Sequence, residues 1–422
     1  MCDIVFSHAQ ILLRIRKAVY FFQYLLNKVH LQYQGWVFLY DYFRLRFFHC
    51  MKIIFASYIY LPQFTSPAQW VNKIKFYTVI MEALAKLNAV EYVGQIGYKG
   101  TYTTAGVQYH FPGLYKKRTL LPLRFNAFIK ERMPDIIIVP GFHFPLQVLL
   151  LRAMVGKKVK IILEHQADRP GGYTLKMLQK VAGRLVDAYH FTSLGNAREW
   201  LDAGIIKDES KCFEIHSTST YFNRQVKATA RQQLKMGLGT HFLWVGRLDE
   251  NKDPLNVLNG FEQYLLVRPG AKLHMIFQAE ALLPFVEKRI AESIPLQEAV
   301  LLHGKIPHAS LAEWYSAADF FISGSHSEGG SVALVEAMSC GCIPIVTTIP
   351  AAMKVISNGE FGLAYPPGDA QALQAQLIHS GEISKEAFSA KVVSHFAETL
   401  SPEAIAKQLD KQFRQLLSNQ VQ

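Results

Sequence analysis

Cysteine is scarce in this sequence, and acidic residues are fewer than basic ones. The chain of 422 residues has five cysteines, at positions that form no regular framework. An odd number of cysteines without regular spacing argues against a disulfide scaffold and against a cysteine-rich zinc site. The sequence therefore favours a reducing compartment, and we expect a cytoplasmic protein.

The shortage of acidic residues leaves a large positive charge. The chain carries 45 lysines and arginines against 33 aspartates and glutamates, which gives a formal net charge of +12. Such an excess is typical of proteins that contact polyanions, whether phosphates, anionic lipid or nucleic acid. Solubility alone is the other explanation, and composition does not decide between them.

Long uncharged runs are missing from residues 1–50, a segment rich in aromatic and basic residues. No uncharged run there reaches the roughly 18 to 20 residues that cross a bilayer, and the apolar run 18–26 lacks the cleavage site of a signal peptide. Two interpretations stay open. The segment lies upstream of a true start at Met51, or it anchors the chain to a membrane surface through basic residues such as Arg14 beside aromatic ones such as Phe21.

Short runs of β-branched residues alternate with helical segments from Met51 onward, which is the pattern of parallel βαβ units. The polar, basic stretch 223–239 interrupts the pattern and marks the expected domain junction. Ligands of doubly wound sheets bind at the carboxyl ends of strands, so the site should be built from the loops that follow them. We expect strands at residues 52–56, 135–139, 160–163 and 188–192 in the first half, and at 241–245, 272–277, 300–302, 320–322 and 343–346 in the second.

A glycine loop follows the strand expected at 320–322. It contains Gly329 and Gly330 and precedes an apolar helical run that includes Glu336. Glycine lets a ligand approach the backbone, and the free N–H groups of the first helical turn attract a diphosphate. A buried carboxylate needs a partner, which ribose hydroxyls would supply for Glu336. An ordinary loop and a solvent-facing glutamate are the alternatives.

Two cations follow the strand expected at 241–245. The chain leaves that strand through Gly246 and presents Arg247 and Lys252 before the next helix. An arginine fork and a lysine point charge together suit a leaving group that gains negative charge. The alternative is a pair of surface cations matched to nearby carboxylates such as Asp249.

These elements, taken in order, resemble the large family of retaining, two-domain glycosyltransferases with the GT-B fold (glycosyltransferase family 4). The resemblance implies two Rossmann-like doubly wound domains that face a central cleft. It further implies that a hexose-type sugar moves from a UDP- or GDP-sugar to a glycan or lipid-linked acceptor, as in the synthesis of cell-surface polysaccharide or lipopolysaccharide. The motif residues that carry it are Gly246, Arg247, Lys252, Gly304, Ala317, Ala318, Asp319, Glu328, Glu336, Ala337, Met338, Gly341, Gly362, Pro367, Gly368 and Asp369.

The resemblance also implies roles for single residues. Glu328 would contact hydroxyls of the transferred sugar, and Glu336 would bind the ribose. Arg247 and Lys252 would hold the diphosphate and assist its departure, so neither a metal nor a cofactor is expected. The donor site would be completed by Gly246, by backbone at Lys305 and Ile306 for the base, and by Gly329, Gly330, Ser331 and Val332 for the phosphate or sugar.

The first half offers two histidines. His143 follows the strand expected at 135–139 and resembles the position of an active-site histidine in family members. His165 follows the next strand and is a second candidate. A structural histidine with its hydrogen bonds satisfied is the alternative for both. Family members often carry a glycine pair in the first loop, where this chain has residues 63–67 without glycine, so a substrate contact by that loop stays open.

The expected domains are an extension at 1–50, an acceptor-binding Rossmann-like domain at 51–230, a nucleotide-sugar-binding Rossmann-like domain at 231–395, and a C-terminal helix at 396–422 that packs back on the first domain. The expected partners are a nucleotide-sugar donor and a glycan or lipid-linked acceptor, with no nucleic acid.

Basic and apolar residues interleave over 114–125. Clustered cations attract anionic headgroups, which favours peripheral contact with the inner face of a membrane; a solvated helix face is the alternative. Two other functions stay open: a nucleotide-sugar epimerase on the same fold, and a non-catalytic nucleotide-sugar-binding protein.

Overall fold

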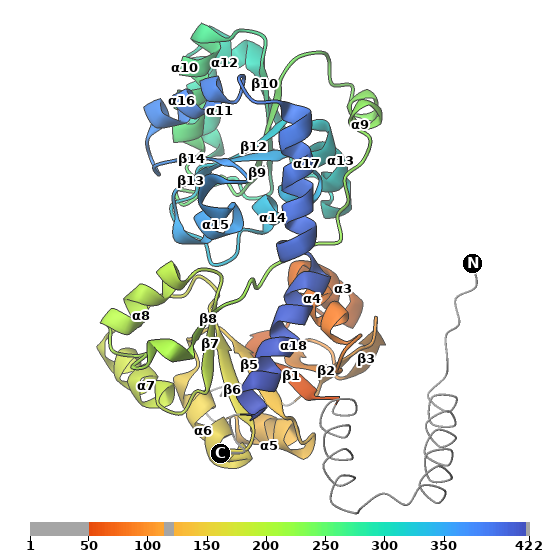
Figure 1. The fold of residues 1–422 in the computed structure, drawn as a ribbon, viewed down its shortest axis with the longest axis vertical. Coiled ribbons are helices and arrows are strands. Elements are labelled where there is room, and N and C mark those ends of the chain that lie inside the picture. Colours follow the sequence, from red (N-terminus) through yellow and green to blue (C-terminus); the bar gives the residue numbers. More distant parts are fainter. Residues whose placement is uncertain (1–49, 114–121, 419–422) are drawn as a thin grey trace, which may run out of the picture. The chain divides into compact units, whose positions relative to one another are not determined.

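The computed structural model describes residues 50–113 and 122–418. The described part contains two separate β-sheets, one in each half of the chain (Figure 1). The extension expected at 1–50, apart from its last residue, and most of the basic stretch 114–125 lie outside the described residues. Among the helices described here, none combines the length and apolarity that crossing a membrane requires.

The first sheet has eight strands in the order β3-β4-β2-β1-β5-β6-β7-β8. Neighbouring strands are parallel except β3 and β4, which form an antiparallel hairpin at one edge. The strands are β1 (Lys52–Leu61), β2 (Ala89–Ile96), β3 (Gly100–Thr104), β4 (Val107–Phe111), β5 (Ile136–Pro140), β6 (Lys160–Glu164), β7 (Ala188–Phe191) and β8 (Cys212–Glu214).

The second sheet has six strands, all parallel, in the order β11-β10-β9-β12-β13-β14. The chain begins in the middle at β9, runs outward to β11, and then returns to β12 on the other side of β9. This reversal is the switch point of a doubly wound sheet. The strands are β9 (His241–Gly246), β10 (Lys272–Phe277), β11 (Val300–Gly304), β12 (Phe320–Ser323), β13 (Ile343–Thr347) and β14 (Leu363–Tyr365).

Both faces of each sheet are covered by apolar cores. On β1, Ile53 and Phe55 belong to one buried cluster, while Ile54 and Ala56 belong to another. Alternate residues of a strand point to opposite faces, so a continuous apolar run is what a central parallel strand requires. The second sheet repeats this arrangement, with its central strand contributing to two further clusters.

Helices follow the strands and cover the sheets (Figure 1). Those between strands of the first sheet are α3 (Pro67–Lys73), α4 (Lys75–Leu84), α5 (Leu123–Glu131), α6 (Pro145–Val155), α7 (Tyr173–Gly183) and α8 (Arg198–Asp202). Those that follow are α9 (Lys227–Gln233), α10 (Pro254–Val267), α11 (Leu283–Ala291), α12 (Ile294–Ala299), α13 (Leu311–Ala317), α14 (Val332–Ser339), α15 (Pro350–Val355), α16 (Ala370–His379), α17 (Lys385–His395) and α18 (Pro402–Ser418).

The predicted fold class is confirmed, because two α/β domains with parallel sheets are present. Every strand expected from the sequence is found, with ends that shift by a few residues. The strands that were not expected are β2, β3, β4, β8 and β14. The central strand β2 was missed because Glu91 and Gly94 interrupt its apolar run, while β8 and β14 are only three residues long.

The helix α9 packs on the second half. Lys227 Nζ lies 3.0 Å from Asp319 Oδ1, and Arg231 Nη2 lies 2.8 Å from Asp319 Oδ2. Asp319 precedes β12, and its Oδ2 atom also accepts a hydrogen bond from the amide of His241 at the start of β9. We therefore propose a domain junction just before Lys227, inside the polar stretch expected to hold it.

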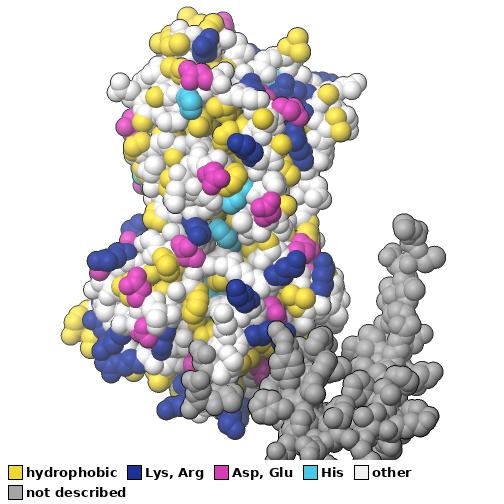
Figure 2. All heavy atoms as spheres, viewed as in Figure 1, with side chains coloured by type: hydrophobic (Ala, Val, Ile, Leu, Met, Phe, Trp, Pro, Cys, Tyr) yellow, Lys and Arg dark blue, Asp and Glu magenta, His cyan; other side chains and the backbone are white. Residues whose placement is uncertain are grey.

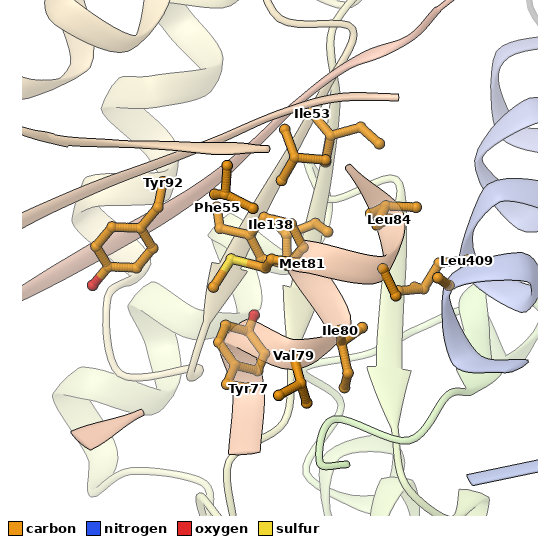
Figure 3. Close-up of a cluster of buried hydrophobic side chains, with 14 of the residues drawn as sticks. Ile53, Phe55, Tyr77, Val79, Ile80, Met81, Leu84, Tyr92, Ile138 and Leu409 are labelled. Atoms are coloured by element: carbon orange, nitrogen blue, oxygen red, sulfur yellow. The ribbon is translucent and has the colours of Figure 1, made fainter. Parts of the chain in front are cut away.

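The last helix, α18, packs on the first half. Its apolar residues Ile405, Leu409 and Phe413 are spaced four apart, which places them on one face, and they join the cluster that contains Ile53. Figure 3 shows Leu409 beside Leu84 of α4. The two halves of the chain are therefore connected both by the segment before α9 and by the segment before α18.

Candidate active site

The switch point of the second sheet brings two charged residues together. Lys252 follows β9 and Glu328 follows β12, and these two strands are neighbours. The lysine ammonium pairs with Glu328 Oε1, and both side chains are largely shielded from solvent. A crevice at the carboxyl ends of strands on either side of a switch point is the usual ligand site of such a sheet.

The loop that carries Glu328 is fixed from both halves of the chain. Asn196 Nδ2, from the first half, donates to the backbone carbonyl of Glu328 at 3.2 Å. Asn251 Nδ2, from the second half, donates to the carbonyl of Ser327 at 3.1 Å. The backbone around the carboxylate is therefore held in place before any ligand binds.

The glycines of this loop are required by protein packing. A Cβ atom at Gly329 would lie 2.3 Å from the backbone nitrogen of Ala167, and one at Gly330 would lie 2.7 Å from a methyl carbon of Thr218. Real Cβ contacts are longer, so both positions exclude a side chain. Close approach of another chain segment thus explains the glycine pair without a ligand. Ser331 follows as the N-cap position of α14, and the amide of Val332 donates to the carbonyl of Gly330.

Glu336 is buried in α14, not on a solvated stripe of that helix. Its side chain is 3% exposed. His308 Nε2 lies 2.5 Å from one carboxylate oxygen, and the hydroxyl of Tyr315 donates to the other at 3.3 Å. The hydrogen bond to Glu336 raises the pKa of His308. The partner that a buried carboxylate needs is thus already supplied by the protein.

Arg247 stands apart from the other predicted charges. Its side chain is largely exposed, and its Nε atom pairs with Asp249 at 3.0 Å, so in this conformation it is a surface cation matched to a nearby carboxylate. Gly246, just before it, leaves little room, because a Cβ there would lie 3.1 Å from the ring of Trp244. Within the described residues, no ion pair or hydrogen bond joins Arg247 to Lys252 or Glu328.

In the first half, the two candidate histidines meet at one aspartate. His143 Nε2 lies 2.8 Å from Asp168 Oδ1, and His165 Nε2 donates to the backbone carbonyl of Asp168 at 3.0 Å. The amide of Phe142 donates to the second oxygen of Asp168 at 2.7 Å. His143 is half exposed, whereas His165 is buried, and burial lowers the pKa of His165. His165 is therefore neutral at physiological pH, and His143 is the one of the two whose ring is exposed to solvent.

Two cavities are lined by residues from both halves. The smaller one, about 180 Å³, brings Glu328 together with His165 and Asp168. The larger one, about 510 Å³, is lined by Glu336 and His308 and lies within the usual size range of small-molecule sites. Its other walls are Asn72, Lys75, Phe76, Val79, Ser219, Thr220, Tyr221, Phe222, Pro307 and Ala309. The predicted pair of glutamates is thus divided between two separate cavities.

The base-binding positions expected at Lys305 and Ile306 follow the end of β11. Gly304, the last residue of β11, has a φ of +63°, a conformation that favours glycine. It turns the chain toward Pro307 and His308, which line the larger cavity. Lys305 itself is exposed, and Ile306 packs against a buried cluster of the second half.

Sequence reasoning missed several polar residues that line these cavities or bond to the residues that line them. His308, Tyr315, Asp168 and Asn196 carry no motif, and each acquires its partner through tertiary packing. Of these residues, Asp168 could most easily have been found from the sequence, since it follows a strand in a loop that contains Pro170 and a glycine pair, and such loops often form ligand sites. A further buried acid is Glu164 at the end of β6, which accepts a hydrogen bond from Tyr77; burial raises its pKa to about 8.

Comparison with known proteins finds similarity to glycosyltransferases, mainly in the second half of the chain. Residues 227–388 match the family model described as glycosyl transferases group 1. A D-inositol 3-phosphate glycosyltransferase of Streptosporangium roseum is 21% identical over 234 residues, which cover 53% of this chain and 54% of that protein. An alpha-monoglucosyldiacylglycerol synthase of Streptococcus pneumoniae is 27% identical over 209 residues, covering 48% of this chain and 47% of that protein. The matches thus span about half the length of these curated relatives.

Solved structures show the same fold over nearly the whole of their length. A sucrose-phosphate synthase from Thermosynechococcus elongatus has a TM-score of 0.63 at 18% identity and covers 87% of this chain and 100% of that one. HepE of Anabaena, solved in complex with UDP, has a TM-score of 0.65 at 15% identity and covers 86% of this chain and 99% of that one. The architecture is therefore that of the GT-B glycosyltransferases. Within the chain, residues 227–388 are the part that is similar to the glycosyl transferases group 1 family.

Proposed function

We propose that this protein transfers a hexose-type sugar from a nucleoside diphosphate donor, a UDP- or GDP-sugar, to a glycan or lipid-linked acceptor, with retention of configuration. The observation that carries the proposal is the pair formed by Lys252 and Glu328 at the switch point of the second sheet. In this pair a cation that would hold phosphate lies beside a carboxylate that would bind sugar hydroxyls. The structural neighbour solved with UDP supports a uridine donor.

In this proposal Lys252 and Arg247 stabilise the departing diphosphate. Lys252 is already held at the switch point, whereas Arg247 would leave Asp249 and turn toward the phosphates. Preorganised charge at a developing anion accounts for a large part of the rate enhancement in many enzymes. Metal ions are not needed if these two cations and the N-terminus of α14 provide that charge.

Glu328 would bind hydroxyls of the transferred sugar. Its present partner, Lys252, would shift from the carboxylate to the phosphate when the donor enters. The two groups are adjacent, as the sugar and the phosphate are in the donor itself. Retention is then explained by attack on the face that the phosphate leaves, with a phosphate oxygen taking the proton of the acceptor hydroxyl.

Glu336 would bind the ribose, and the backbone at Lys305 and Ile306 would contact the base. The larger cavity supports this assignment, since Glu336 lines it together with Pro307, which follows Ile306 directly. Gly246, Gly329, Gly330, Ser331 and Val332 would border the diphosphate and sugar.

The acceptor would enter from the first half, where Asp168, the partner of His143, lines the space that contains Glu328. We propose an acceptor-binding domain from residue 51 to the junction before Lys227, and a donor-binding domain from there to residue 395. The helix at the end, within 396–422, then belongs structurally to the acceptor domain. We also propose that the protein works in the cytoplasm, in peripheral contact with an anionic membrane.

Calorimetric titration with UDP, GDP and ADP tests the donor site directly. We expect one of the first two to bind, and Glu336→Gln to weaken that binding while Glu328→Gln leaves it nearly unchanged. Failure of all three nucleotides to bind would contradict the proposal and favour a protein that has kept only the fold. Nucleotide release from a UDP-sugar that requires an acceptor would separate transfer from epimerisation.

A further inference from the structure

The helix α7 exposes its apolar side to solvent. Only two residues of this helix, Gln179 and Ala182, are buried. Tyr173 is 84% exposed, Met177 49% and Val181 46%. These three residues are spaced four apart and so form one row along the helix. Leu185, just past the end of the helix, continues the row, and Leu178 lies beside it, both exposed.

A second row on the same side of α7 is basic. Lys176, Lys180 and Arg184 are also spaced four apart, one position before the apolar residues, and the helix contains no acidic residue. Figure 2 shows hydrophobic and basic side chains gathered at the lower left of the view, where Figure 1 places α7. The helix therefore presents an apolar row and a cationic row to the same solvent side.

The end of α7 opens onto a basic pocket. This pocket, of about 530 Å³, is lined by Arg152, Gly156, Lys157, Lys160, Arg184, Leu185, Val186, Asp187 and Lys211. Asp187 is the one acid among these lining residues, against five cations. The Arg152 side chain is fixed by hydrogen bonds to the carbonyls of Leu185 and Val159 and by its pair with Asp187. One side of the pocket is thus held in place by hydrogen bonds, and its lining residues carry a net positive charge.

The other end of α7 lies near the proposed active site. The loop before the helix contributes Asp168 and Arg169 to the cavity that contains Glu328. An α-helix rises about 1.5 Å per residue, so α7 extends for roughly 16 Å from the side of that cavity toward the basic pocket.

We propose that this surface of α7, which we call the α7 face, docks on an anionic phospholipid bilayer. It comprises Tyr173, Met177, Leu178, Val181 and Leu185 with Lys176, Lys180 and Arg184. A helix with one apolar row beside one cationic row lies in the plane of a membrane interface, with the apolar side chains entering the acyl boundary and the cations at the headgroups. The basic pocket beside Leu185 receives a lipid phosphate.

Charge decides between a bilayer and a protein partner here. The cores of protein interfaces are depleted of lysine, whereas on the α7 face a lysine or arginine directly precedes Met177, Val181 and Leu185. Docking in this way would bring the cavity near Asp168 to the headgroup layer, within reach of a sugar on a lipid. That consequence rests on the proposed glycosyltransferase function, but the docking itself does not.

Vesicle sedimentation with the full chain tests the proposal. Vesicles of phosphatidylcholine mixed with phosphatidylglycerol should bind the protein, and vesicles of phosphatidylcholine alone should bind it weakly. Met177→Glu with Val181→Glu should reduce binding to the anionic vesicles about tenfold or more, as should Lys176→Glu with Lys180→Glu. The matched controls lie on the second half: Leu266→Glu, an exposed apolar residue of α10, and Lys288→Glu, an exposed lysine of α11.

Hydrogen exchange locates the contact without any substitution. Amides of residues 173–185 should exchange more slowly on anionic vesicles than in solution, while those of α10 should not change. Full binding by the Met177→Glu, Val181→Glu variant, or unchanged exchange over α7, would overturn the proposal. The proposal would also be overturned if the parent protein self-associates and this variant does not. The α7 face would then be an interface between copies of the chain. Vesicle binding that persists in a protein unable to bind any nucleotide would uphold this inference and refute the proposed function instead.

Discussion

His308 Nε2 lies 2.5 Å from Glu336 Oε1. A histidine side chain is therefore already hydrogen-bonded to the carboxylate that we propose binds the ribose. The two groups come from different elements, His308 from the turn after β11 and Glu336 from α14. A ribose hydroxyl that donates to this carboxylate must share it with His308 or displace the ring. Donor binding should therefore depend on the charge of His308.

The first prediction is a pH dependence of nucleotide affinity. The hydrogen bond to Glu336 raises the pKa of His308 above its ordinary value of 6.5. The charged pair is therefore fully formed below pH 6.5 and is lost as pH rises through the raised pKa. We expect UDP affinity to increase over that window, because neutral His308 competes less for the carboxylate. Calorimetry at several pH values measures this.

The control for that prediction is His308→Gln, which keeps a hydrogen-bond donor but cannot titrate. Its affinity should follow only the ionisation of UDP itself. An identical pH profile in the parent and in the variant would show that His308 does not control the site.

The second prediction concerns Glu336→Gln. Hydrogen bonds to charged groups contribute roughly 1.5 to 3 kcal/mol, so UDP affinity should fall by a factor between about 10 and 100. The pKa of His308 should return toward 6.5, which NMR titration of the ring protons can follow. Glu328→Gln serves as the matched control, because it should lower turnover and leave UDP affinity largely intact. Equal UDP affinity in Glu336→Gln and the parent would refute the ribose assignment.

The third prediction is that charge, and not a metal, stabilises the leaving group. Lys252→Ala and Arg247→Ala should each lower turnover by a factor on the order of 100, whereas Lys288→Ala, an exposed lysine, should have no effect. Activity should survive EDTA. A loss of activity in EDTA that a divalent ion restores would show that the two cations are insufficient.

The fourth prediction assigns Asp319 a structural role. This buried carboxylate binds Lys227, Arg231 and the amide of His241. Burial alone would raise its pKa, but the charge of Lys227 and the amide hydrogen bond together lower it below 3.8. Its stabilisation is therefore present above pH 3.8 and is lost as pH falls through the lowered value.

Asp319→Asn leaves the partly exposed cations Lys227 and Arg231 without their buried counter-charge. The free energy of unfolding, measured in urea at neutral pH, should fall by at most about 3 to 5 kcal/mol, the cost of breaking a fully buried pair. Acid unfolding of the variant should start at higher pH than in the parent, because less stability remains to be lost. The exposed pair of Arg198 and Asp202 gives the control, since Asp202→Asn should cost less than about 1 kcal/mol. A stability equal to the parent's would show that helix α9 is held by other contacts.

The sequence predicted the strands better than it predicted the partners of charged residues. Continuous β-branched runs such as the one in β5 identify buried parallel strands from local composition alone. The meeting of Lys252 and Glu328 also follows from topology, once β9 and β12 are neighbours. The bonds of Glu336 to His308 and Tyr315 could not be predicted, because they depend on how a turn and the helix α13 pack against α14.

The glycine pair shows the same limit. Gly329 and Gly330 were expected to make room for a ligand, and the structure fills that space with Ala167 and Thr218 of the first half. A glycine in a loop predicts that another group lies close to the backbone, but it does not predict whether that group is a ligand or another part of the chain. Only the tertiary arrangement shows that one half of the chain approaches the other at this point.

The return of α18 to the first half has a consequence for the order of events during synthesis. Ile405, Leu409 and Phe413 complete a buried cluster whose first strand begins at Lys52. Ribosomes add roughly 5 to 20 residues per second, so the nascent first domain waits for the whole second domain to be translated before its core closes. Until then, the apolar side of α4 is uncovered and available to chaperones. The first domain to be synthesised is therefore the last to be finished.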